Sequence, residues 1–131
     1  MVDLSLAPIP ARMLHDTAVL KVVTGIDRYQ NKTYEEFTIN NVHLQGSNDT
    51  IKSANNTEVQ LRGTLFIDAR RSLPALDIYA LQERSLSNGD TMRAVVTDAS
   101  GNSAGDFAVL IVDGVPDVPA TRCHHWELGL V

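Results

Sequence analysis

The sequence contains a single cysteine, Cys123, among its 131 residues. One thiol excludes an intramolecular disulfide and fits a reducing compartment. No apolar run reaches the roughly 20 residues that a transmembrane helix needs. The amino-terminal stretch has neither the basic start nor the long apolar core of a secretion signal. We therefore expect neither a disulfide-stapled secreted domain nor a membrane-spanning protein.

Positive charge and aromatic side chains are also scarce. The net charge is −5, and the basic residues are scattered, with Arg70 and Arg71 as the only adjacent arginine pair. Proteins that grip nucleic acid usually carry a basic patch, so we expect no tight or sequence-specific DNA binding. An acidic surface instead lets DNA slide past, because like charges repel. Three Phe, three Tyr and one Trp are few for a carbohydrate-binding module, which needs exposed aromatic rings on one face.

The dominant pattern in the sequence is the alternation of apolar and polar residues. A chain of this length, 44% hydrophobic, is large enough for one domain with its own core. Six segments have the alternating, β-branched character of strands: 17–24, 34–45, 58–69, 91–99, 106–114 and 121–131. We therefore expect an all-β fold with small α content, a single antiparallel β-barrel or sandwich of about six strands.

Three local features interrupt this pattern. A bulge near Asn40 and Asn41 shifts the phase of the second segment, so that Val42 returns to the inner face. Gly63 marks a bend or bulge within the third segment. Residues 74–87 carry apolar side chains at helical spacing, which predicts one short helix or an irregular crossover.

The two longest stretches without strand character have different compositions. Residues 1–12 contain Pro8 and Pro10 among apolar side chains. Proline fixes φ and favours extended neighbours, so this stretch predicts an extended N-terminal arm before a single domain over 13–131. Residues 45–58 are rich in Asn, Ser and Thr, which predicts a long polar loop between strands.

The final residues, TRCHHWELGLV, combine a thiol, two imidazoles, an indole and a carboxylate. In a strand, alternation places Trp126 on the core face with His124, and Cys123, His125 and Glu127 on the opposite face. Two side chains of that opposite face can chelate one ion. A closed zinc site takes four ligands, however, and the chain has no second cysteine. We therefore expect no metal site and no cofactor.

Catalysis is not expected either. A Cys–His nucleophile needs the thiol within hydrogen-bond reach of the imidazole and a third group that orients the base. Cys123 and His125 share a face of the expected strand, but no nucleophile elbow or glycine-rich oxyanion loop accompanies them. The remaining imidazoles, His15 and His43, are expected to lie outside any ligand cluster. The sequence thus predicts a protein that is not an enzyme.

Four motifs occur in one order along the chain: PARMLHDTAVLK (10–21), LFIDARRSLP (65–74), SNGDTMRAVV (87–96) and CHHWELGLV (123–131). Together they resemble the minor capsid or head–tail connector proteins of tailed bacteriophages. The resemblance implies a head-completion or stopper subunit in the neck of the virion, made in the host cytoplasm. Such subunits form homo-oligomeric rings, commonly of about twelve copies, with closed symmetry. The implied partners are portal or adaptor proteins on the head side and tail proteins on the other, with DNA passing through the channel.

This hypothesis assigns two sets of candidate residues. Contacts with neighbouring subunits or partners are expected from the arm and from the basic loop, at Val2, Leu4, Leu6, Ile9, Arg70 and Arg71. A loop facing the channel or the tail is expected at Asn48, Asp49, Lys52, Asn55 and Asn56.

Two other functions stay open at this point. A tail terminator or tail-tube ring subunit is also a small β-rich ring former, and a hexamer rather than a dodecamer would identify it. A free-standing β-sandwich that binds a ligand is more distant, and glycan binding by the isolated monomer would identify that one.

Overall fold

A computed structural model describes residues 7–47, 50–52, 57–117 and 123–131 of the chain. Strands dominate, with one α-helix and one short 3-10 helix. In chain order the elements are η1 (Ala11–Met13), β1 (Asp16–Ile26), β2 (Lys32–Gly46), β3 (Thr50–Lys52), β4 (Glu58–Gln60), β5 (Gly63–Asp68), α1 (Ile78–Ser87), β6 (Arg93–Thr97), β7 (Ser103–Pro116) and β8 (Cys123–Leu130).

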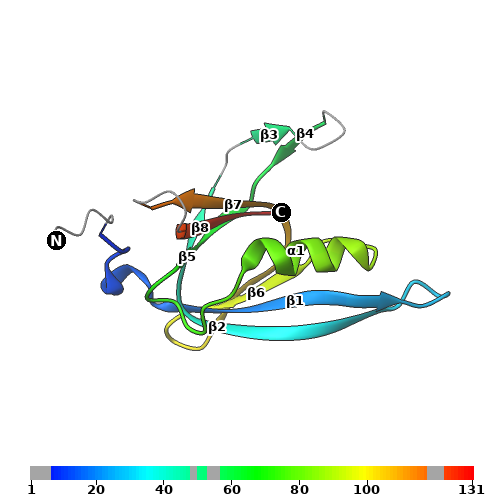
Figure 1. The fold of residues 1–131 in the computed structure, drawn as a ribbon, viewed down its shortest axis with the longest axis horizontal. Coiled ribbons are helices and arrows are strands. Elements are labelled where there is room, and N and C mark those ends of the chain that lie inside the picture. The colour runs from blue at the N-terminus through cyan, green and yellow to red at the C-terminus, as the bar shows by residue number, and fades with distance from the viewer. Residues whose placement is uncertain (1–6, 48–49, 53–56, 118–122) are drawn as a thin grey trace.

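Six of the strands form a closed antiparallel barrel. Their hydrogen-bonded order is β1-β2-β5-β8-β7-β6, and β6 pairs back with β1. The expected all-β fold of about six antiparallel strands is therefore confirmed, and of the two expected forms, barrel or sandwich, the strand order is the closed one. β3 and β4 form a separate two-stranded sheet that lies apart from the barrel strands (Figure 1).

The inner face of the barrel holds one continuous hydrophobic core. Every barrel strand contributes alternate side chains, as the period of two requires. The largest fully buried members are Leu20, Ile39, Leu65, Ile78, Met92, Leu128 and Leu130. Each such side chain stabilises the fold by roughly 1.5–3 kcal/mol relative to an exposed position.

The bulge predicted at Asn40 and Asn41 is confirmed. Asp16 pairs with Val42, whereas the next residue of β1, Thr17, pairs with Asn40, so Asn41 is the extra residue. Asn41 has a φ of 61°, a left-handed conformation that Asn adopts more readily than most residues. The bulge returns Val42 to the core, where it is fully buried.

The segment 58–69, expected as one strand, is two strands in different sheets. β4 pairs with β3, and the chain turns before β5 enters the barrel. The backbone N–H of Arg62 donates to the carbonyl of Leu130, which ties this turn to the end of β8. A Cβ at Gly63 would lie 3.2 Å from the carbonyl oxygen of Gln45, so a larger residue at this start of β5 would require its neighbours to shift by a few tenths of an ångström. The expected loop 45–58 thus contains β3 and ends where its partner β4 begins.

Helix α1 confirms the helical pattern in residues 74–87. Asp77 caps its N-terminus by accepting a hydrogen bond from the backbone N–H of Ala80 at 3.2 Å. The buried side of the helix consists of Ile78, Gln82 and Ser85, whereas Tyr79 is about half exposed at 45%. The helix therefore presents the apolar Ile78 and the half-buried Leu81 to the core, together with the polar Gln82 and Ser85.

Those polar side chains close a gap between strands. β1 pairs with β6 only over residues 17–21, and α1 lies alongside the barrel where that pairing ends (Figure 1). There the hydroxyl of Ser85 accepts from the backbone N–H of Val23 at 3.0 Å, and the amide of Asn88 donates to the Val23 carbonyl at 2.9 Å. Gln82 accepts from the backbone N–H of Met92 at 3.0 Å. Side chains of the helical segment thus replace strand pairing along this seam.

Candidate functional site

The C-terminal strand β8 has the alternation that its sequence predicts. Trp126, Leu128 and Leu130 belong to the buried core, and His124 is also buried, at 8% exposure. The indole of Trp126 packs edge-on against the ring of Tyr79, with centroids 4.9 Å apart. β8 is therefore a sheet element whose indole points inward, as expected.

The thiol of Cys123 is a structural group here. Its sulfur donates to the backbone carbonyl of His125 at 3.2 Å, so it does not pair with the imidazole. Burial raises the pKa of the Cys123 thiol above its ordinary value, which disfavours the thiolate. A Cys–His nucleophile is thus not assembled at these two residues.

The two adjacent imidazoles form a hydrogen-bonded chain that reaches the N-terminal segment. His124 Nε2 lies 2.5 Å from the carbonyl oxygen of Ala7, and its Nδ1 lies 2.7 Å from His125 Nδ1. His125 Nε2 lies 3.2 Å from a carboxylate oxygen of Glu127. A carbonyl only accepts, so His124 Nε2 donates to Ala7 and His124 Nδ1 accepts from His125.

All four histidines of the chain and Phe66 lie in one row of rings, in which His43, Phe66 and His125 stand on the faces of their strands opposite the core and His124 is buried. The row runs His15, His43, Phe66, His125, His124, with successive ring centroids 5.7, 6.0, 6.3 and 5.0 Å apart. His15 directly precedes β1, and the next three rings come from β2, β5 and β8. These strands are consecutive neighbours in the barrel order, so the row crosses the sheet.

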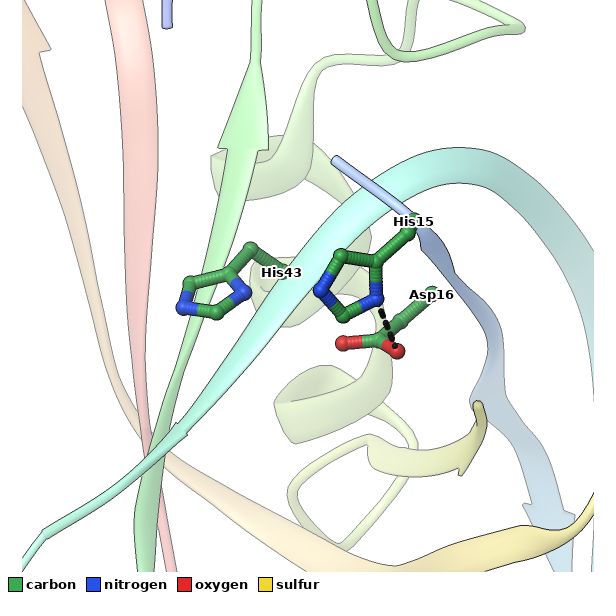
Figure 2. Close-up of side chains that lie close together, drawn as sticks. All are labelled: His15, Asp16 and His43. Atoms are coloured by element: carbon green, nitrogen blue, oxygen red, sulfur yellow. Dashed lines mark hydrogen bonds and ion pairs between the residues drawn. The ribbon is translucent and has the colours of Figure 1, made fainter. Parts of the chain in front are cut away.

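The expectation that His15 and His43 stand outside any ligand cluster is wrong. Figure 2 shows the imidazole of His15 between the imidazole of His43 and the carboxylate of Asp16. One ligand atom from each of the three residues lies within 4.8 Å of the other two, the only such group among the described residues. The reason is the bulge at Asn41. Because Asp16 pairs with Val42, the preceding His15 comes to lie across from His43.

A shallow apolar cavity of about 230 Å³ adjoins this row of rings. It is lined by Ile9, Met13, His43, Gln45, Phe66 and His125. Ile9 and Met13 belong to the N-terminal segment, so the cavity lies between that segment and the outer face of the barrel.

Of the expected arm contacts, Ile9 is the one within the described residues; Val2, Leu4 and Leu6 lie outside them. The backbone N–H of Ile9 donates to Asp68 Oδ2 at 2.7 Å. The end of the arm therefore lies on its own barrel.

The basic loop is organised by the same aspartate. Asp68 Oδ1 accepts from the backbone N–H groups of Arg70 and Arg71 at 2.8 and 2.9 Å. The guanidinium of Arg70 lies 3.8 Å from the buried carboxylate of Asp117 in the same chain. Arg71 is exposed and lines a pocket of about 340 Å³ with Leu73 and other residues. Contacts of either arginine with another protein stay a prediction.

Of the expected channel-facing residues, Lys52 is placed at the end of β3, where its backbone pairs with Glu58. Asn48, Asp49, Asn55 and Asn56 lie outside the described residues. Their expected role also stays a prediction.

The clustering of His15, Asp16 and His43 was detectable only in part from the sequence. The predicted bulge gave the correct inner and outer faces of β2, but the sequence does not show which residue of β1 pairs with which residue of β2. Without that register, two imidazoles 28 residues apart carry no signal of proximity.

No helix within the described ranges is long and apolar enough to cross a membrane. No protein-family model matches the chain, and no curated protein or solved structure matches it significantly.

Proposed function

We propose that this chain is a structural virion protein of a tailed phage, a ring-forming head–tail connector of the head-completion or stopper kind. It would occupy the neck between portal and tail and line the DNA channel. The observation that carries the proposal is a closed barrel from which an arm and two hairpins emerge (Figure 1). The ordered motifs in the sequence support the same assignment.

A closed barrel suits a ring subunit because it has no free strand edge of its own. Copies then join through the elements that leave the barrel. One such element is the β1–β2 hairpin, whose paired residues 22–26 continue beyond the last β1–β6 pair. At its tip the side chain of Tyr29 is 70% exposed. In a closed ring, one self-compatible surface of this kind repeats around the axis.

Charge supports a passive role toward DNA. The net charge of −5 and the scattered basic residues favour a channel wall that lets DNA pass without holding it. The blocked thiol of Cys123 supports a role without chemistry. Gating would then be steric, by loops that enter the channel.

The test is genetic removal from the phage that encodes the chain. Loss of the protein is expected to give DNA-filled heads that lack tails and leak their DNA, alongside free tails. The full chain supplied in trans restores infectious particles, whereas a chain without residues 1–12 folds but does not enter the particles. A matched control is Glu83→Gln on the exposed side of α1, which is expected to restore infectivity fully.

Three other outcomes would contradict parts of this proposal. Stable full heads with tails of abnormal length would identify a tail terminator instead. Normal infectious particles without the chain would exclude a virion role. Incorporation of the truncated chain at wild-type level would refute the role of the arm.

A further inference from the structure

We propose that His15, Asp16 and His43 bind a divalent transition metal ion of the Zn²⁺ type where the N-terminal segment enters the barrel. This inference does not depend on the proposed function. It rests on the geometry of three side chains and on one buried nitrogen that has no hydrogen-bond partner.

The carboxylate of Asp16 is the fixed member of the group. Its side chain is only 6% exposed. Oδ2 accepts from the backbone N–H of Leu44 at 2.9 Å, and Oδ1 lies 3.0 Å from His15 Nδ1. β1 begins at Asp16, opposite Val42, so Leu44 lies beyond the end of β1 and the carboxylate takes the place of a strand partner.

His43 supplies the second, independent observation. Its Nδ1 is buried and has no hydrogen bond to any described residue. Buried polar atoms in native proteins are almost always paired, and an exception calls for an explanation such as an ion. The ring cannot easily turn away, because it stacks on Phe66 at 6.0 Å and meets the edge of His15 at 5.7 Å.

The donor set selects the class of ion. Two imidazoles and one carboxylate suit Zn²⁺ and its neighbours, whereas Ca²⁺ and Mg²⁺ prefer six or more oxygen ligands. Three protein ligands leave a fourth position for water. In a tetrahedral zinc site the ligand atoms are about 3.3 Å apart, which follows from metal–nitrogen distances near 2.0 Å. The ligand atoms lie within 4.8 Å of one another, so binding would draw them closer together, and the 52% exposed side chain of His15 has room to move.

The C-terminal group fits an ion less well. The sulfur of Cys123 is bonded to a backbone carbonyl, and both ring nitrogens of His125 already have partners in His124 and Glu127. A metal there would have to break three existing hydrogen bonds.

The experiment is titration of the full metal-free chain with ZnCl₂ by isothermal calorimetry. We expect one Zn²⁺ per chain, with no binding of Ca²⁺ or Mg²⁺ at the same concentration. His15→Ala and His43→Ala are each expected to weaken binding more than ~10-fold, since even loss of an outer hydrogen-bond partner typically costs that much. His15 is exposed, so its replacement tests the site even where His43→Ala disturbs folding.

Two control variants separate this site from the C-terminal one. His125→Gln and Cys123→Ala are expected to leave the affinity unchanged. Cobalt substitution gives a second readout, since thiolate ligation would add a sulfur-to-cobalt charge-transfer band that nitrogen and oxygen ligands lack. The proposal is overturned by absence of stoichiometric Zn²⁺ binding, by an unchanged affinity in His15→Ala, or by a loss in the control variants as large as in His15→Ala.

Discussion

Replacement of Asp68 by asparagine tests how the N-terminal arm is fastened. The buried carboxylate, in a residue that is 1% exposed, accepts three backbone hydrogen bonds. Oδ1 accepts from Arg70 and Arg71, and Oδ2 accepts from Ile9. An asparagine keeps one oxygen, which satisfies most donors when it faces the two arginine amides. The new NH₂ group then faces the N–H of Ile9, and two donors oppose each other.

The size of the effect follows from the bond that is lost. A hydrogen bond to a charged group contributes about 1.5–3 kcal/mol. Since 1.4 kcal/mol corresponds to a factor of ten, the detached population of residues 7–10 is expected to rise about 10- to 100-fold. The strand pairs of the barrel are not changed by this substitution, so the barrel itself stays folded.

The assay is amide hydrogen exchange by NMR on Asp68→Asn and the unchanged chain. We expect faster exchange at Ile9 by that factor, with smaller changes at Arg70 and Arg71. Asp113→Asn, at an exposed position of β7, is the matched control and should leave Ile9 unchanged. The reasoning fails where Ile9 exchanges at the same rate in Asp68→Asn as in the unchanged chain.

Three further results are expected. Gln82→Met leaves the N–H of Met92 without its acceptor and should lower the free energy of unfolding in urea by about 1–3 kcal/mol. A decrease below about 0.5 kcal/mol would contradict the idea that side chains of the helical segment replace strand pairing there. The hydrogen bond from Lys32 lowers the pKa of Asp90 below its ordinary 3.8. The ionised carboxylate therefore stabilises the fold above pH 3.8, and this stabilisation is lost as the pH falls through the lower pKa of the folded state. Asp90→Asn should therefore flatten the acid limb of a stability–pH curve below pH 3.8, and an unchanged limb would argue against the pair. Burial raises the pKa of Cys123, so the rate of alkylation by iodoacetamide should have its midpoint above pH 9.0, and a lower midpoint would indicate a reactive thiol.

The strands were predictable because the polarity of each side chain indicates whether it faces the core or the solvent. Alternation located all six barrel strands, and the paired asparagines located the bulge that Asn41 forms. The inward indole of Trp126 followed from the same period of two. Helical spacing likewise located α1 within residues 74–87, although two of the residues on its buried side, Gln82 and Ser85, are polar.

The candidate site was not predictable by the same means. Its members are neighbours only because β1 and β2 pair in one register, and alternation within a strand carries no information on register between strands. The division of residues 58–69 was missed for a related reason. Its alternation continues through Leu61 and Gly63, while the change of sheet depends on the contact of Arg62 with the end of β8. The His15, Asp16 and His43 cluster and the division of residues 58–69 both depend on pairing between segments that are distant in the sequence.

The seam beside α1 has a consequence for how the barrel opens. Between paired strands, hydrogen bonds form a cooperative ladder, whereas at the seam each is supplied by a separate side chain. Water can replace those side-chain partners one at a time, so fluctuations of the native state should begin there. The amides of Val23 and Met92 would then exchange before those of β5 and β8. Movement of α1 away from the barrel would thus open the sheet at this one place while the other strand pairs stay closed.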